Sequence, residues 1–156
     1  MEIPVRVPAS IEHLVGEWTG TKRLWFAADQ PSLDSAGTAR VSRVGGGHFL
    51  AISYEWVFEA KGQEGLILLQ CNEAKHTGEA SWVDSFHMSG SIMLSKGTFS
   101  GGVLNVLGAY AAPPGPDWGW RIIVDASDAA HLRLLMDNVS PSGQSDRAVE
   151  AVFTRR

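Results

Sequence analysis

The sequence contains a single cysteine, and this scarcity excludes several classes of protein. Cys71 has no second cysteine with which to form an intrachain disulfide, so the chain is not a disulfide-stabilised scaffold of the secreted kind. No hydrophobic run approaches the roughly 20 residues that a membrane helix needs. Residues 1–8 lack the apolar core of a signal peptide. We therefore expect a cytoplasmic protein with no membrane segment.

Basic residues and catalytic motifs are also sparse. Lysine and arginine number 13 against 17 acidic residues, and no basic stripe is present to neutralise phosphates, so no nucleic-acid partner is expected. The five histidines show no metal-ligand spacing. Asp84 and His87 are three residues apart, so on a regular strand they would face opposite ways. No phosphate loop, dinucleotide fingerprint or nucleophile elbow occurs. We expect neither a metal nor a cofactor.

Glycine and proline, by contrast, are plentiful and mark frequent turns. The chain has 17 glycines and 7 prolines, and between them apolar and polar residues alternate from Glu17 onward. Before this pattern begins, Ser10 is expected to cap a helix of at most two turns that Gly16 ends. The period-two pattern predicts strands at about residues 17–27, 36–44, 47–60, 64–74, 78–87, 90–95, 98–100 running into 102–111, 117–126, 130–139 and 146–155.

The alternation also indicates how the strands are arranged. In the segment 47–60, one face carries Leu50, Ile52, Tyr54, Trp56 and Phe58. One apolar face and one polar, solvent-facing face are typical of antiparallel strands around a single core. Short connections make consecutive strands pair, and closing such a meander removes its exposed edges. We predict an all-β fold, an antiparallel up-and-down barrel of about ten strands, formed by one domain over residues 1–156.

Two short motifs resemble those of a known family. Gly16-Glu17-Trp18-Thr19-Gly20 opens the first predicted strand, and Trp82-Val83-Asp84-Ser85 lies in the middle of the chain. In this order they resemble a bacterial family classified only as a calycin-like (lipocalin-like) domain of unknown function, over about residues 10–155. The resemblance implies a barrel with Trp18 plugging one end, and it implies no established activity.

A more distant resemblance is to nitrobindin, a ten-stranded haem barrel whose proximal histidine lies on the last strand. The last predicted strand here has the same hydrophobic-then-basic ending, but its residues 148–156 include no histidine. The resemblance therefore supports the barrel and does not extend to haem binding.

Several inward-facing residues are candidates for a ligand site. Asp84 shares a face with Trp82 and Phe86, where burial would raise its pKa and make it an acid, a base or a polar anchor; alternatively it pairs with a cation across the barrel. Lys22 either meets an anionic head group or extends to the barrel mouth. The tryptophans either line a cavity or fill a solid core. The predicted cavity lining is Lys22, Tyr54, Trp56, Trp82, Asp84, Trp120 and Asn138.

Three functions are compatible with this pattern. The first is a binding protein that holds a small apolar or amphipathic molecule inside the barrel. The second is an enzyme that uses the same cavity, with Asp84 as acid or base. The third is a solid barrel that pairs with a second copy through outward apolar residues, namely Trp25, Phe49 and Val57.

Overall fold

Ten β-strands follow one another in the computed structural model, which describes residues 4–156 apart from the side chain of Ser89. The predicted domain, residues 1–156, therefore includes Met1–Ile3, which lie outside the described residues. A short helix, α1 (Ala9–Glu12), precedes the strands, and a 3-10 turn, η1 (Gly45–Gly47), follows the second of them. The strands are β1 (Gly16–Leu24), β2 (Leu33–Val44), β3 (Phe49–Phe58), β4 (Lys61–Asn72), β5 (Thr77–Asp84), β6 (Met88–Ser100), β7 (Val103–Tyr110), β8 (Trp118–Asp125), β9 (His131–Val139) and β10 (Ser145–Arg155).

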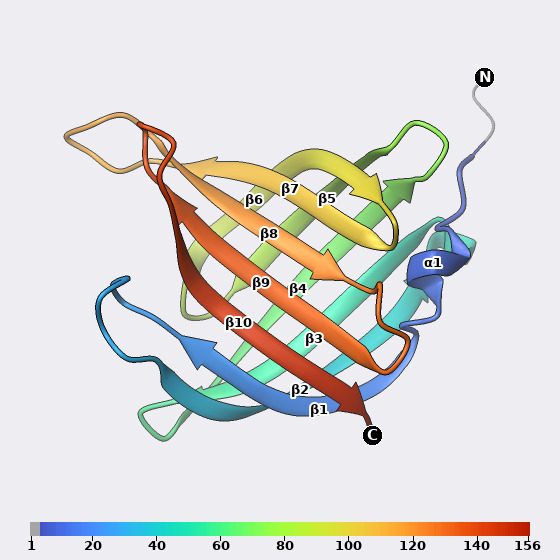
Figure 1. Ribbon diagram of the computed structural model, residues 1–156, viewed down its shortest axis with the longest axis horizontal. Helices are drawn as coiled ribbons and strands as arrows, with labels where there is room; N and C mark the ends of the chain where they lie inside the picture. Colours follow the sequence, from blue (N-terminus) through green and yellow to red (C-terminus); the bar gives the residue numbers. More distant parts are fainter. Residues whose placement is uncertain (1–3) are drawn as a thin grey trace.

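The strands form a closed barrel, as Figure 1 shows. Each strand pairs antiparallel with its neighbours in sequence, and β1 pairs with β10 to close the ring. The predicted all-β, up-and-down barrel of about ten strands with a short N-terminal helix is confirmed. Within residues 4–156, no helix is long and apolar enough to cross a membrane.

The predicted inward faces form the core of the barrel. On β3, Tyr54 is 5% exposed and Trp56 is 3% exposed, whereas Phe49 and Val57 are 39% and 47% exposed. This contrast follows the alternation of side chains across a strand. The period-two pattern therefore assigns inside and outside correctly along β3.

Two details of the predicted pattern are wrong. Residues 90–95 and 98–100 belong to one strand, β6, because Gly97 lies within a ladder rather than at a turn. A Cβ atom at Gly97 would lie 2.0 Å from the carbonyl oxygen of Asn105, so close backbone packing explains this glycine. The helix also begins earlier than predicted, after Pro8, and the Ser10 hydroxyl does not cap it but donates to Glu73 at 3.2 Å.

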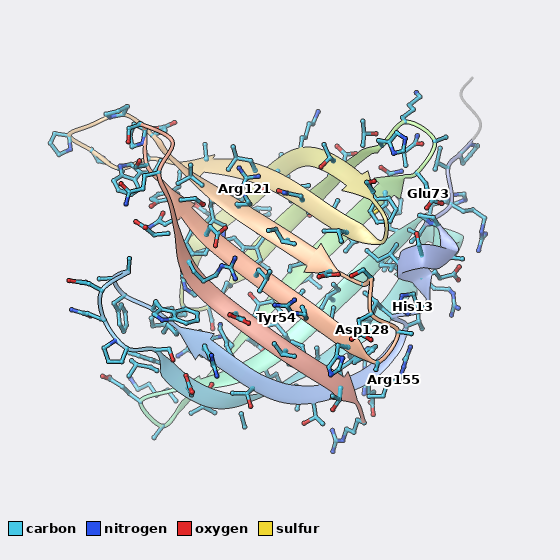
Figure 2. All side chains as sticks on the ribbon, viewed as in Figure 1. His13, Tyr54, Glu73, Arg121, Asp128 and Arg155 are labelled. Carbon is cyan, nitrogen blue, oxygen red and sulfur yellow. The ribbon has the colours of Figure 1, made fainter. Side chains whose placement is uncertain are left out.

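One end of the barrel is closed by the segment that contains α1. Trp18 is fully buried there, and its indole N–H donates to the carbonyl of Leu14 at 2.7 Å. The guanidinium of Arg155 lies 4.4 Å from the centre of the Trp18 ring and donates to the carbonyl groups of Val15 and His13. Figure 2 shows Arg155 and His13 near each other at this end. Trp18 thus plugs the barrel end.

The barrel wall is interrupted near the opposite end. The β6–β7 ladder joins Lys96–Ser100 to Val103–Leu107, and in the described pairing the first half of β6 contacts β5 alone. A bulge places residues 89–92 opposite Val83. Bulges bend the strand that carries them, and this one lies beyond the last β6–β7 ladder pair, Lys96 with Leu107. The seam is this stretch of β6 and β7 without ladder pairs, where Met93 and Ser95 of β6 still lie beside Gly108 of β7.

Candidate functional site

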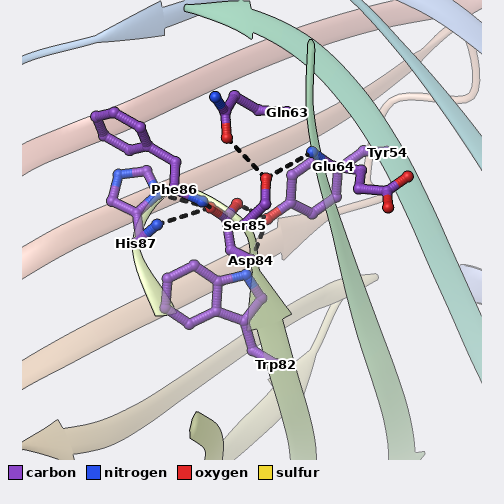
Figure 3. Close-up of polar contacts among 8 residues, drawn as sticks. All are labelled: Tyr54, Gln63, Glu64, Trp82, Asp84, Ser85, Phe86 and His87. Carbon is purple, nitrogen blue, oxygen red and sulfur yellow. Dashed lines mark hydrogen bonds and ion pairs between the residues drawn. The ribbon is translucent and has the colours of Figure 1, made fainter. Parts of the chain in front are cut away.

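The carboxylate of Asp84 is the centre of a polar network inside the barrel mouth (Figure 3). Its Oδ2 accepts a hydrogen bond from the Tyr54 hydroxyl at 2.5 Å. Its Oδ1 accepts from the backbone N–H groups of Phe86 and His87 at 2.7 and 2.8 Å, and lies 3.2 Å from the His87 Nδ1. Both oxygens are therefore occupied, although the side chain is buried.

The short turn after β5 makes this network possible. β5 ends at Asp84, and residues 85–87 form a turn before β6 begins at Met88. The expectation that Asp84 and His87 face opposite ways is wrong, because the strand predicted to reach residue 87 stops three residues earlier. The turn brings the two side chains to the same carboxylate oxygen. The aspartate also caps the turn through its two backbone contacts.

These contacts determine the charge of the carboxylate. Burial opposes ionisation, but the hydrogen bonds from His87 and Tyr54 outweigh it and lower the pKa of Asp84 from 3.8 to about 2. The prediction that burial would raise this pKa is therefore wrong. Burial raises the pKa of the Tyr54 phenol well above 10.0, and the adjacent Asp84 carboxylate adds to this shift. Asp84 is ionised and Tyr54 is a neutral donor.

Tyr54 also links the network to the aromatic wall. Its oxygen accepts a hydrogen bond from the Trp82 indole N–H at 2.9 Å while its hydroxyl proton goes to Asp84. Gly65 lies directly opposite Tyr54 on β4, and a Cβ there would be 2.3 Å from the phenol oxygen. The absence of a side chain at Gly65 thus allows the phenol to reach across β4.

Lys22 is buried inside the barrel, only 4% exposed. Its ammonium nitrogen lies 3.2 Å from the centre of the Trp56 ring and 5.6 Å from that of Tyr54, positions in which an aromatic face attracts a cation. Burial lowers the pKa of Lys22 from 10.5 to about 7, although the Asp84 carboxylate partly opposes this shift. The alternative in which Lys22 extends to the barrel mouth is therefore wrong.

A pocket of about 450 Å³ lies at the seam where β6 leaves β7. This size falls within the range of small-molecule sites. The rings of Trp82 and Trp120 stack in its wall, 5.4 Å apart and within 6° of parallel. The His87 ring is 5.3 Å from that of Trp120. The lining consists of Trp82, His87, Met88, Ser91, Met93, Tyr110, Ala111 and Trp120.

Some polar atoms around the pocket have a hydrogen-bond partner and others have none. The Tyr110 hydroxyl donates to the Asn138 side-chain oxygen at 2.5 Å. The buried indole N–H groups of Trp120 and Trp56, in contrast, have no hydrogen-bond partner among the described residues. Unpaired buried donors are uncommon in folded proteins. The Trp120 donor belongs to a residue that lines the pocket.

Of the predicted lining residues, Trp82 and Trp120 line the mouth pocket. Tyr54 and Asp84 belong to the polar network that Trp82 joins, and Asn138 accepts a hydrogen bond from the pocket residue Tyr110. Lys22 and Trp56 pack against each other outside the pocket lining, and the Trp56 ring lies 6.2 Å from that of His87. Their role in ligand binding stays a prediction.

Sequence reasoning missed several pocket residues, above all His87 and Tyr110. His87 was assigned to a strand, although Asp84, three residues earlier, is a residue that can cap a turn. Tyr110 ends β7 at the mouth, and Ala111 follows it. Met88 and Met93, which also line the pocket, were not singled out from the sequence. In the described part of the chain, no group of three or more histidine, cysteine, aspartate or glutamate side chains is arranged to hold a metal ion.

A larger hollow of about 620 Å³ lies on the outside of the wall formed by β3 to β6. It is lined mainly by exposed side chains, among them Glu55, Leu66 and Ile92, and the buried Tyr54 and Asp84 of the polar network also border it. The mouth pocket is the better candidate site, because it is bordered by stacked aromatic rings and by an unpaired buried donor.

Comparisons with known proteins give no activity. The structure is similar to the crystal structure of Rv2717c from M. tuberculosis, with a TM-score of 0.62, 15% identity, and coverage of 96% of this chain and 99% of that chain. A DUF3598-family protein of unknown function from Nostoc punctiforme PCC 73102 is also found, with a TM-score of 0.41, 12% identity, and coverage of 99% of this chain and 51% of that one. At these identities the first likeness shows the barrel fold alone.

The family itself is shown by sequence. No curated protein matches the chain. The sequence model of a family described as "Protein of unknown function (DUF1579)" matches residues 5–155, which is nearly the whole chain. This barrel, with its closed helical end and its aromatic pocket at the other, belongs to the DUF1579 family.

Proposed function

We propose that this barrel binds a small apolar or amphipathic molecule in the mouth pocket. The observation that carries the proposal is the pocket wall, in which Trp82 and Trp120 stack beside His87 and Tyr110 around about 450 Å³. Aromatic walls with a few placed polar groups are typical of small-molecule sites. We also propose a cytoplasmic location, since the buried Cys71 thiol is free.

The polar network behind the wall supports a binding role more strongly than catalysis by Asp84. Both oxygens of Asp84 are hydrogen-bonded, and its pKa is lowered to about 2. A carboxylate in this state is a weak base and is not protonated at neutral pH, so it is poorly suited to act as an acid. Its geometry instead holds Tyr54 and His87 in place.

Native mass spectrometry of the freshly purified protein tests the proposal directly. We expect a mass excess that disappears on denaturation and that names the ligand. In parallel, titration with the neutral dye Nile red should give saturable fluorescence enhancement. Ala111→Trp should fill the pocket and weaken dye binding at least about tenfold, which corresponds to about 1.4 kcal/mol.

Ala109→Trp is the matched control, because Ala109 lies two residues earlier, on β7, and both alanines are exposed, but only Ala111 lines the pocket. This variant should bind the dye like the wild type. The proposal would be contradicted if both variants bound the dye equally and the native mass spectrum showed no mass excess.

Association of two copies is a second candidate function, favoured by the outer face. Ile92 and Leu94 are 70% and 75% exposed on β6. Phe49 and Leu107, which line an outer hollow together with Leu94, are 39% and 42% exposed. Contiguous exposed apolar residues are typical of interaction surfaces. Light scattering should give a dimer mass that Leu94→Glu reduces to the monomer, while Thr21→Glu, at an exposed position of β1, should leave it unchanged. A monomer at high concentration would contradict this candidate.

A further inference from the structure

We propose that the ligand of the mouth pocket is a planar aromatic molecule with a hydroxyl group, and that His87 recognises this hydroxyl. The inference rests on the proposed binding function and narrows its ligand class to phenols. It is carried by two polar atoms in the aromatic wall, one acceptor and one donor, that have no partner among the described residues.

The acceptor is Nε2 of His87. The Asp84 oxygen that lies 3.2 Å from Nδ1 also accepts two backbone N–H bonds, and an ionised carboxylate only accepts. In the neutral imidazole, Nδ1 therefore carries the proton and Nε2 presents its lone pair. Nε2 makes no hydrogen bond with the described residues, and His87 lines the pocket. Asp84 is a positioning residue here, since it selects the tautomer of His87.

The donor is the indole N–H of Trp120, which is buried and unpaired within the described part of the chain. Its ring centre lies 5.3 Å from that of His87, so one small group can approach both residues. A carbonyl accepts from Trp120 but offers nothing to Nε2. A hydroxyl accepts from the indole and donates to the imidazole, and it is the smallest group that does both.

The other residues of the pocket lining favour a particular ligand body to carry the hydroxyl group. The stacked Trp82 and Trp120 rings, with Tyr110 beside them, favour a flat aromatic body. The described residues that line the pocket include no aspartate, glutamate, lysine or arginine. A carboxylate or an ammonium group would therefore lose its hydration without gaining a charged partner in the lining. A neutral phenol avoids this loss.

Two matched probes test the ligand class by calorimetry at pH 8.0. 2-Naphthol can donate and accept, whereas 2-methoxynaphthalene has the same ring system but can only accept. We expect 2-naphthol to bind roughly tenfold more tightly, the effect of one well-formed hydrogen bond. His87→Phe keeps an aromatic ring and removes Nε2, so the ratio of the two affinities should fall to within about twofold, whatever the affinity of the variant for the ether.

A second readout on the unaltered protein guards against misfolding of the variant. With ¹⁵N-labelled histidine, NMR should show His87 protonated at Nδ1, and its Nε2 signal should move with 2-naphthol but not with 2-methoxynaphthalene. Equal affinities for the two probes, or a stationary Nε2 signal, would overturn the phenol assignment and leave the binding function standing. Failure of both probes to bind would overturn both.

Discussion

Gly65 and Tyr54 face each other across the β3–β4 ladder, and the phenol oxygen of Tyr54 occupies the space that a side chain at Gly65 would need. From there the hydroxyl reaches Asp84, 30 residues further along the chain. The pair therefore determines whether the network behind the pocket forms.

Gly65→Ala should displace Tyr54 from Asp84. The added Cβ would lie 2.3 Å from the phenol oxygen, and overpacking of this kind costs roughly 1–3 kcal/mol. We expect the free energy of unfolding in urea to fall by about this amount. Gly62→Ala on the same strand is the control, because nothing lies within 4 Å of its added Cβ. Equal effects of the two substitutions would show that the close approach has no energetic weight.

Tyr54→Phe should destabilise the protein by roughly 1.5–3 kcal/mol, the usual range for a hydrogen bond to a charged group. The change removes the donor to Asp84 and leaves the Trp82 indole N–H without its acceptor. Tyr110→Phe removes a hydroxyl that donates to the neutral Asn138 in a part-buried position, and should cost about 1 kcal/mol. Chemical denaturation gives both values, and a larger loss for Tyr110→Phe would contradict this ranking.

Acid unfolding should report the ionisation of Asp84. Its pKa is about 2 in the folded protein and 3.8 in the reference state, so the ionised carboxylate stabilises the fold above about pH 4. This contribution, about 2 kcal/mol, should be lost as the pH falls from 4 toward 2. Asp84→Asn should be less stable at pH 6 but should lose less stability over this interval. Parallel pH profiles for the two proteins would rule out this role.

Lys22 should make the fold more stable as the pH rises. Its pKa is about 7 in the folded protein and 10.5 in the reference state, so between these values the unfolded chain binds the extra proton. The free energy of unfolding should therefore increase by about 2 kcal/mol between pH 7 and pH 9. Lys22→Met should remove this increase.

The comparison between the wild type and Lys22→Met is kept at or below pH 9 because of Cys71. Burial raises the pKa of that thiol from 9.0 to about 12, so its own effect lowers stability above pH 9. The difference between the two proteins isolates the lysine, and a difference that does not change with pH would contradict the assignment.

The sequence by itself determined the strand pattern and the faces of the strands. Alternating apolar residues on β3 predicted that Tyr54 and Trp56 face inward, because the side-chain period of a strand is two. Gly101-Gly102 forms a true turn, where both residues adopt positive φ, although the strand pattern ran residues 98–100 into 102–111. Gly97 shows the limit of such signals, because the reason for a glycine there is the backbone of Asn105 on the next strand.

Only the tertiary structure decided which inward residues form the candidate site. His87 joins Asp84 because β5 ends early and the chain turns, and Lys22 stays buried because the Trp56 ring lies beside its ammonium. The pocket lies where the β6–β7 ladder has ended, beside the bulge between β5 and β6. The first of these features is a local turn that periodicity does not describe, and the other two depend on contacts between separate strands.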